Sequence, residues 1–126
     1  MTVRMPDTAP PVLTVGELTS MIKLSLENEF PALWVRGEVS GCKRGTTGHL
    51  YFSLKEGRQA LIDCFMWRDD AMRLTFPARD GLEVEAFGGV SVYEARGRFQ
   101  LVVREMRPAG RGALLLALHE RRSPAR

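Results

Sequence analysis

Residues 49–55 read HLYFSLK, and this stretch decides the fold class. Its apolar residues Leu50, Phe52 and Leu54 stand at every second position, which is the period of a strand that buries one face. The same alternation recurs in four further segments, at residues 33–40, 60–67, 82–92 and 99–106. The sequence therefore predicts an all-β domain of five strands.

Helical signals precede, interrupt and follow these strands. Thr14 and Glu17 have the spacing of a capping box, and apolar residues follow them at helical spacing. We expect a helix over residues 15–28 whose apolar stripe plugs one end of the strand domain and joins its core. One or two helical turns are predicted within residues 68–76, between the third and fourth strands, and a further helix at residues 112–122.

This order of elements is that of the OB-fold barrel, in which five strands carry a helical insertion between the third and the fourth. A barrel this small needs sharp bends, which Gly37 and the pair Gly88-Gly89 permit. A β-sandwich would need about seven strands. The glycine-rich stretch GCKRGTTG, residues 41–48, is expected to be a loop. We therefore predict a five-stranded OB-fold barrel with an N-terminal helix, a short internal helix and a C-terminal helix.

Length and composition are those of a single globular domain. The chain has 126 residues, of which 44% are hydrophobic and 26% charged, and its net charge is +3. The longest apolar run, residues 113–118, is far too short to span a membrane, and no targeting signal precedes the first helix, so we expect a cytoplasmic protein. The two cysteines, Cys42 and Cys64, and the two histidines, His49 and His119, do not have metal-ligand spacing, so no metal or other cofactor is expected.

Acidic residues do not form a recognisable catalytic site. Glu83 and Glu85 lie two positions apart, and Asp69 and Asp70 are adjacent. Neither pair has a third carboxylate or a histidine at a spacing that would hold a catalytic metal ion. The stretch at residues 41–48 lacks the lysine that follows the last glycine of a phosphate-binding P-loop. No catalytic residue is assigned, and a binding function fits the sequence better.

Aromatic and basic residues on the outward strand faces indicate nucleic-acid binding. Bases stack on exposed rings for about 1–3 kcal/mol each, while neighbouring cations hold the phosphates. The face carries Trp34, Arg36, His49, Tyr51, Phe65 and Trp67. The loops beside it carry Lys43, Arg44, Arg96 and Arg98, and a rim is formed by Lys55, Arg58, Arg68 and Arg73. The alternative is that the larger rings pack against the N-terminal helix and that the arginines only confer solubility.

Four long segments of the chain carry a recognisable family pattern, namely TVGELTSMIKLSLENEFPALWVRGE, WVRGEVSGCKRGTTGHLYFSLKE, IDCFMWRDDAMRL and DGLEVEAFGGVSVYEARGRFQLVVREMRPAGRGALLLA. They resemble the N-terminal OB-fold domain of the exodeoxyribonuclease VII large subunit. The similarity runs from about residue 12 to about residue 118. Two positions depart from the family pattern, because Cys42 stands where an aromatic residue is frequent and Ala95 replaces a frequent proline.

The resemblance implies a module that binds single-stranded DNA and delivers it to a nuclease. The family's enzyme cuts single-stranded DNA from both the 5′ and the 3′ end, releasing oligonucleotides and finally 5′-mononucleotides. Its large subunit binds several copies of a small helical subunit, and its catalytic region follows the OB-fold domain, so no catalytic residue transfers to this chain. The DNA-binding residues that transfer are Trp34, Arg36, Lys43, Arg44, His49, Tyr51, Trp67, Arg68, Tyr93, Arg96 and Arg98.

The resemblance also divides the chain and leaves two other functions open. Residues 1–11 are expected to be a disordered lead-in, residues 12–110 the nucleic-acid-binding domain, and residues 111–126 the start of a helix leading toward an absent catalytic region. One other function is a docking domain whose aromatic face binds the rest of the large subunit. The second is an RNA-binding OB-fold domain like the anticodon-binding modules of tRNA synthetases, because the residues alone do not separate DNA from RNA.

Overall fold

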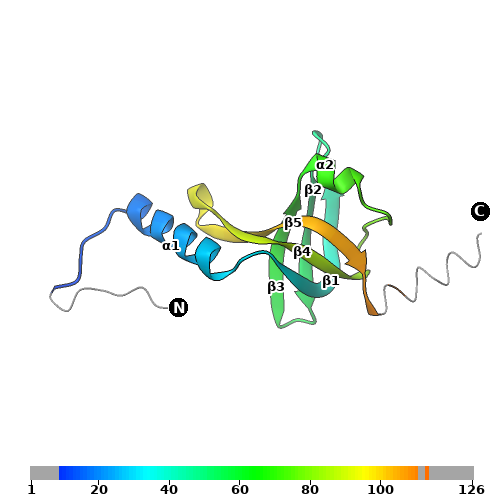
Figure 1. Cartoon of the computed structure of the whole chain (residues 1–126), viewed down its shortest axis with the longest axis horizontal. Helices are drawn as coiled ribbons and strands as arrows, with labels where there is room; N and C mark the ends of the chain where they lie inside the picture. Colours follow the sequence, from blue (N-terminus) through cyan, green and yellow to red (C-terminus); the bar gives the residue numbers. More distant parts are fainter. Residues whose placement is uncertain (1–8, 111–112, 114–126) are drawn as a thin grey trace, which may run out of the picture.

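Five strands close into a barrel in the computed structural model, which describes residues 9–110 and residue 113 (Figure 1). The strands are β1 (Leu33–Arg44), β2 (Leu50–Glu56), β3 (Ala60–Met66), β4 (Glu83–Tyr93) and β5 (Arg98–Pro108). The helices are α1 (Val15–Glu29), α2 (Arg68–Met72) between β3 and β4, and the 3-10 turn η1 (Glu94–Arg96) between β4 and β5. Around the barrel the strand order is β1-β2-β3-β5-β4, and only β3 and β5 run parallel among these described strands.

The predicted OB-fold barrel, with its N-terminal helix and short internal helix, is confirmed. The helix predicted at residues 112–122 lies, residue 113 apart, outside the described residues. The same is true of residues 1–8 of the predicted lead-in.

Strand β1 closes the barrel because it pairs with two different strands. Its first half runs antiparallel to β4 and its second half antiparallel to β2, and Glu38 has a partner on both. Gly37 precedes this changeover and is buried. A Cβ atom at Gly37 would lie 3.1 Å from Cβ of Leu54 and 3.3 Å from the carbonyl oxygen of Lys55. The glycine therefore permits the close approach of β1 to β2 at the bend.

Strand β1 also runs further than predicted, through residue 44 instead of ending at residue 40. The register with β2 shifts between Ser40 and Lys43, where Gly41 has a φ angle of 61°. Pairing then resumes with Lys43 opposite Tyr51. The glycine and the charges at residues 41–44 thus mark a β-bulge, which interrupts the strand without ending it.

Alternating side chains from all the strands fill the barrel, as the period of two predicts. In β2 the inward residues Leu50, Phe52 and Leu54 are buried. The rest of the core consists of Val39, Cys64, Met66, Ala71, Leu82, Val84, Ala86, Leu101, Val103 and Met106. Ala71 comes from α2, so this short helix packs directly against the strand side chains.

Strands β4 and β5 form a long hairpin that reaches away from the barrel toward α1 (Figure 1). The register between the two strands shifts between Phe87 and Gly88, so a β-bulge lies where the Gly88-Gly89 pair was expected to permit a bend. A Cβ atom at Gly88 would overlap the carbonyl oxygen of Val102 and lie 2.9 Å from Cα of Val103. Glycine is required at this position because the backbone of β5 passes where a side chain would begin.

Helix α1 does not plug the barrel, and that prediction is wrong. The predicted capping box is present, since Thr14 Oγ1 accepts from the backbone N–H of Glu17 at 3.0 Å and Glu17 Oε1 accepts from that of Thr14 at 2.8 Å. Yet α1 buries none of its residues, and Val15 is 81% exposed. Strand side chains already fill the barrel, so the apolar stripe of α1 has no cavity to enter.

No helix in the described part of the chain is long and apolar enough to cross a membrane.

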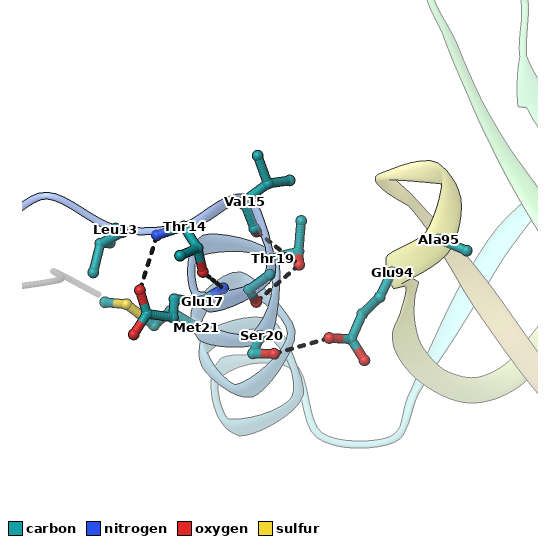
Figure 2. A pocket seen from close by; sticks show the side chains of 10 residues that line it. Leu13, Thr14, Val15, Glu17, Thr19, Ser20, Met21, Glu94 and Ala95 are labelled. Carbon is teal, nitrogen blue, oxygen red and sulfur yellow. Dashed lines mark hydrogen bonds between the residues drawn. The ribbon is translucent and has the colours of Figure 1, made fainter.

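Helix α1 instead contacts the tip of the β4–β5 hairpin through Glu94. The hydroxyl of Ser20 donates to Glu94 Oε2 at 2.9 Å, and Lys23 Nζ lies 3.6 Å from Glu94 Oε1. Figure 2 shows the Ser20–Glu94 bond joining α1 to the turn that carries Ala95. Exposed polar contacts of this kind contribute at most about 1 kcal/mol. They orient α1 beside the hairpin more than they stabilise the domain.

Candidate nucleic-acid interface

A groove of about 780 Å³ lies where the β1–β2 side of the barrel faces the β4–β5 hairpin. The exposed aromatic and basic residues that line it are Lys43 from β1, Tyr51 from β2, Tyr93 from β4, Arg96 from η1, and Arg98 and Phe99 from β5. Its remaining lining residues are Gly41, Phe52, Ser53, Asp63, Cys64 and Gln100. Three exposed rings and three cations from separate chain segments therefore meet in one groove.

The hairpin wall of the groove turns two of these rings to solvent. Tyr93 pairs with Arg98 at the end of the ladder, and Gly97 closes the turn in the left-handed conformation with φ 61°. Tyr93 is 54% exposed and Phe99 is 55% exposed. Large exposed rings in one place mark an interaction surface, and such rings are what nucleobases stack on.

The outer face of β2 and β3 carries a continuous row of rings that begins in the groove. Tyr51 contacts Phe65 with ring centroids 5.3 Å apart, and Phe65 contacts Trp67 at 4.9 Å. His49 contacts Phe65 at 5.4 Å and Trp67 at 5.1 Å. The interplanar angles, between 51° and 89°, are the tilted and edge-to-face geometries that aromatic pairs favour. The rings hold one another in place and leave Trp67 exposed at the far end.

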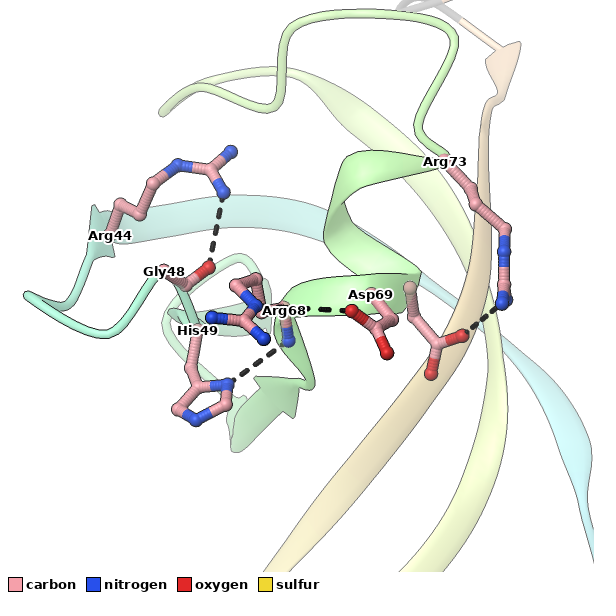
Figure 3. A network of polar contacts seen from close by, with 7 residues as sticks. Arg44, Gly48, His49, Arg68, Asp69 and Arg73 are labelled. Atoms are coloured by element: carbon pink, nitrogen blue, oxygen red, sulfur yellow. Dashed lines mark hydrogen bonds and ion pairs between the residues drawn. The ribbon is translucent and has the colours of Figure 1, made fainter.

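The loop before β2 and the start of α2 position the basic groups at that far end (Figure 3). The backbone N–H of Arg68 donates to His49 Nδ1 at 3.0 Å, so in the neutral imidazole the proton is on Nε2. Arg44 donates to the carbonyl of Gly48 at 3.1 Å. Gly48 has φ 91°, and a Cβ atom there would lie 2.8 Å from Cδ of Arg68. Arg68 also has its Nε 3.8 Å from a carboxylate oxygen of Asp69.

Trp34 and Arg36 belong to a different patch, on the half of β1 that pairs with β4. The Trp34 ring contacts Phe87 at 5.2 Å, and the guanidinium of Arg107 lies 4.0 Å from the centroid of the Trp34 ring. Glu85 accepts from Arg107 at 2.8 Å and from Arg36 at 3.1 Å. The hydrogen bonds from Arg107 and then from Arg36 lower the pKa of the Glu85 carboxyl. The charged side chains of this patch therefore form ion pairs with one another, whereas three cations and one carboxylate line the groove.

The predicted site residues fall into three places. Those that line the groove are Lys43, Tyr51, Tyr93, Arg96 and Arg98. Those that lie along or beyond the adjoining row of rings are Arg44, His49, Trp67 and Arg68. Trp34 and Arg36 are in the patch with Glu85, because β1 changes its pairing partner at Glu38 and carries the two ends of the strand to different sides.

Sequence reasoning missed Phe99 and the polar residues of the groove floor. Phe99 shares the alternation phase of Leu101 and Val103, which are buried, so its phase predicts an inward side chain. The sequence carried no signal of this, because the predicted segment 99–106 is no longer than the predicted segments 33–40 and 60–67. Only the structure shows that β4 and β5 each have 11 residues whereas β2 and β3 each have 7. Ser53, Asp63 and Gln100 lie on the outward faces and carried no distinguishing pattern.

The groove offers a ligand aromatic faces and positive charge, with one buried thiol beneath. Burial raises the pKa of Cys64 to about 12, and burial together with the nearby Asp80 carboxylate raises the pKa of Cys42. Both side chains are therefore neutral thiols near pH 7. No group of three or more histidine, cysteine or acidic side chains that could hold a metal ion occurs among the described residues.

Comparison with known proteins assigns the family. A family model described as an OB-fold nucleic acid binding domain matches residues 13–107. The chain belongs to this family. Its OB-fold domain is 49% identical over 105 residues to the exodeoxyribonuclease 7 large subunit of Rhodopirellula baltica, covering 83% of this chain and 24% of the relative. For the same subunit of Azotobacter vinelandii the identity is 47% over 106 residues, covering 84% and 23%.

The chain thus spans about a quarter of the length of these relatives. Solved structures with the same fold include a replication protein A heterotrimer bound to single-stranded DNA, with a TM-score of 0.50 and 20% identity over 71% of this chain and 66% of that one. Another is the mitochondrial single-stranded DNA-binding protein Rim1 of S. cerevisiae, with a TM-score of 0.50 and 17% identity over 63% and 94%. At these identities the likeness shows the fold alone.

Proposed function

We propose that the groove binds single-stranded DNA and that this OB-fold domain is the strand-binding module of an exodeoxyribonuclease VII large subunit. One observation carries the proposal, the convergence of exposed rings and cations from separate chain segments on one groove. The residues concerned are Lys43, Tyr51, Tyr93, Arg96, Arg98 and Phe99. The identity to large subunits of exodeoxyribonuclease 7 supports DNA as the nucleic acid.

The chemistry of the groove suits an unpaired strand better than a duplex. Bases can stack on Tyr51, Tyr93 and Phe99 only when they are not stacked within a helix. Three cations that neutralise phosphates give a slope of log affinity against log salt of about −2, and participation of Arg44 and Arg68 steepens it to about −3.5. Stacking and phosphate contacts alone carry little sequence information.

The wider role follows from the family resemblance. The domain would hold the strand while a catalytic region elsewhere in the large subunit cuts it, in a complex with several small helical subunits in the bacterial cytoplasm. A nuclease that cuts strands from both ends requires a binding surface that accepts any base sequence, and stacking of bases on the groove's rings is sequence-tolerant. The chain by itself is proposed to bind DNA without cutting it.

Fluorescence anisotropy with a labelled oligo(dT) at two salt concentrations tests the proposal. We expect salt-sensitive binding that exceeds the binding of a matched duplex and of oligo(U). Equal or tighter binding of oligo(U) would make this an RNA-binding domain instead. The absence of salt-sensitive binding to any oligonucleotide would overturn the proposal.

Matched variants locate the site. Tyr93→Ala removes an exposed groove ring and should weaken oligo(dT) binding about 5-fold or more, whereas Phe30→Ala removes an exposed ring at the end of α1 and should not. Arg96→Ala should weaken binding and lower the salt slope by about 0.7, whereas Arg104→Ala, in an exposed residue of β5 that does not line the groove, should change neither. Equal effects within either pair would place the site elsewhere.

A second function, docking to the rest of the large subunit, is favoured by the exposed stripe of α1. Val15, Leu18 and Ile22 share one face of α1 and are all exposed, on a helix that buries no residue. Because the matched residues cover only about a quarter of the relatives' length, we propose that the remainder of the subunit covers this stripe. Hydrogen exchange of α1 should slow in a full-length large subunit relative to the isolated domain. Equal exchange in the two would contradict docking through α1.

A further inference from the structure

One acidic residue lies in a groove that otherwise carries positive charge. Among the described residues that line the groove, Asp63 of β3 is the one carboxylate. It pairs across the sheet with Ser53 of β2, and the Ser53 hydroxyl donates to Asp63 Oδ1 at 3.3 Å. Asp63 is exposed. A carboxylate repels phosphate, so its place in a phosphate-binding groove needs a reason.

The position of Asp63 relative to the stacking rings supplies one. Tyr51 opposite Phe65 and Ser53 opposite Asp63 are successive pairs on the same outward face of β2 and β3. Neighbouring pairs on one face are about 6.6 Å apart along the strand, which is close to the width of a nucleobase. A base stacked on Tyr51 can therefore bring its hydrogen-bonding edge to the Ser53–Asp63 pair. The cations Lys43 and Arg98 lie on other strands of the groove, where phosphates can reach them.

The chemistry of a carboxylate selects among the bases. An ionised carboxylate only accepts hydrogen bonds, so it favours a base edge that presents N–H donors. The Watson–Crick edge of guanine presents two adjacent donors, N1–H and the N2 amino group, which match the two oxygens of one carboxylate. The corresponding edge of thymine presents one N–H between two carbonyl oxygens, and those carbonyls are repelled by the carboxylate. Unpaired bases expose this edge, whereas bases in a duplex do not.

We propose that Asp63 reads the base stacked beside it and gives the groove a preference for guanine over thymine at that position. Ser53 holds the carboxylate in place through its hydroxyl. This inference rests on the proposed binding of single-stranded DNA and adds to it a base-selective position within an otherwise sequence-tolerant groove. A bidentate contact of this kind discriminates between bases by about 5-fold or more.

A structural role for Asp63 makes a different prediction. Asp63 also lines a smaller recess with Arg98 and Phe99 of β5. Attraction between Asp63 and Arg98 would steady the hairpin wall for every strand alike. Removing the carboxylate would then change the affinity for all oligonucleotides by one common factor and leave their ratio unchanged.

Two oligonucleotides and two variants distinguish these roles. The probes are a labelled 15-mer of dT and the same 15-mer with a single central dG, which cannot form guanine quadruplexes. A 15-mer offers the groove several binding registers, and only some of them place dG beside Asp63. We therefore expect the wild-type domain to bind the dG-containing strand more tightly at low salt, by a measurable factor smaller than the roughly 5-fold preference of the single contact. Asp63→Asn should abolish this ratio while keeping or improving the affinity for dT alone. Glu105→Gln, which removes one negative charge from an exposed residue outside the groove lining, should leave the ratio unchanged.

The outcomes separate the inference from the proposal beneath it. An equal affinity of the wild type for both strands, or a ratio that survives Asp63→Asn, overturns base reading by Asp63 while leaving single-strand binding intact. Absence of binding to either strand overturns the proposed function and base reading with it. Thermal unfolding of Asp63→Asn shows whether the variant is folded, and Asp63→Ser provides a second uncharged variant in which the ratio should also be lost.

Discussion

Replacing Gly88 with alanine should disrupt the pairing of β4 with β5, whereas replacing its neighbour Gly89 should not. A Cβ atom at Gly88 would overlap the carbonyl oxygen of Val102, and would lie 2.8 Å from the carbonyl carbon of Val102 and 2.9 Å from Cα of Val103. These are backbone atoms, so no side chain can rotate to make room. At Gly89 nothing lies within 4 Å of the corresponding atom. The two adjacent glycines therefore form a matched pair.

The expected loss of stability for Gly88→Ala is about 3–5 kcal/mol. Overpacking costs about 1–3 kcal/mol, and moving β5 away from β4 at this point breaks about two ladder hydrogen bonds at about 1 kcal/mol each. Domains of this size have a free energy of unfolding of about 5–15 kcal/mol, so the variant loses a large share of it and its Tm falls by about 12 °C or more. Gly89→Ala should change the free energy of unfolding by less than about 1 kcal/mol, because alanine there meets open space.

Urea and thermal unfolding followed by far-ultraviolet circular dichroism measure both variants. Equal midpoints for Gly88→Ala and Gly89→Ala would refute the reasoning, since they would mean that β5 does not pass against Gly88. The same bulge lies at the base of the hairpin that carries Tyr93 and Phe99. Gly88→Ala should therefore also lose affinity for oligo(dT) under conditions in which Gly89→Ala retains it.

Three further results are expected. Phe99→Ala should weaken oligo(dT) binding about 5- to 150-fold and leave the thermal midpoint nearly unchanged, whereas a large fall in the midpoint would mark Phe99 as a core residue. At pH 8 a thiol reagent should modify Cys42 slowly and spare Cys64, whose pKa burial raises to about 12, until the domain unfolds; mass spectrometry that finds both modified in the folded domain would contradict this. The hydrogen bonds from Arg107 and Arg36 lower the pKa of Glu85, so the contribution of this carboxylate to stability is complete above the ordinary glutamate pKa and is lost as the pH falls through the lowered value. Arg107→Ala should raise the pKa of Glu85 in an NMR titration. An unchanged pKa would contradict the pairing.

The strands could be predicted because a closed barrel forces one face of each strand inward. In β2 the residues Leu50, Phe52 and Leu54 are buried as their phase predicts. The alternation of apolar and polar residues along a strand follows directly from the burial of one strand face in the barrel core. The bend at Gly88 was predictable for a different reason, since glycines inside a strand often mark a bend or the close approach of another backbone.

The orientation of α1 could not be predicted from the same kind of pattern. An apolar stripe indicates that one face of a helix is buried against something, but it does not indicate what covers that face. Leu18 and Ile22 have the spacing of core residues and are exposed in the isolated domain. The matched part covers about a quarter of the length of the relatives, so a face of α1 can be encoded for contact with another part of the large subunit.

The site was predictable by residue type but not by arrangement. Trp34 and Tyr51 are both outward aromatic residues, and nothing in their local sequence separates them. They lie in different surroundings because β1 exchanges β4 for β2 as its partner at Glu38, a pairing between segments distant in the sequence. The charge balance differs between the two surroundings. Beside Trp34, the cation Arg107 is paired with Glu85. In the groove, three cations share one carboxylate among the described lining residues, that of Asp63.

The groove exists because two strands are longer than the barrel requires. Strands β2 and β3 close their part of the barrel with 7 residues each, and the 11-residue strands β4 and β5 extend past it as a paired hairpin. Within the barrel, the phase of Leu101 and Val103 places a side chain in the core; beyond it, the same phase places Phe99 against solvent. Alternation therefore fails where the hairpin leaves the barrel, and that projecting segment supplies Tyr93, Arg96, Arg98 and Phe99 to the groove. The candidate binding surface thus lies largely on residues outside the barrel core, which is why core patterning cannot locate it.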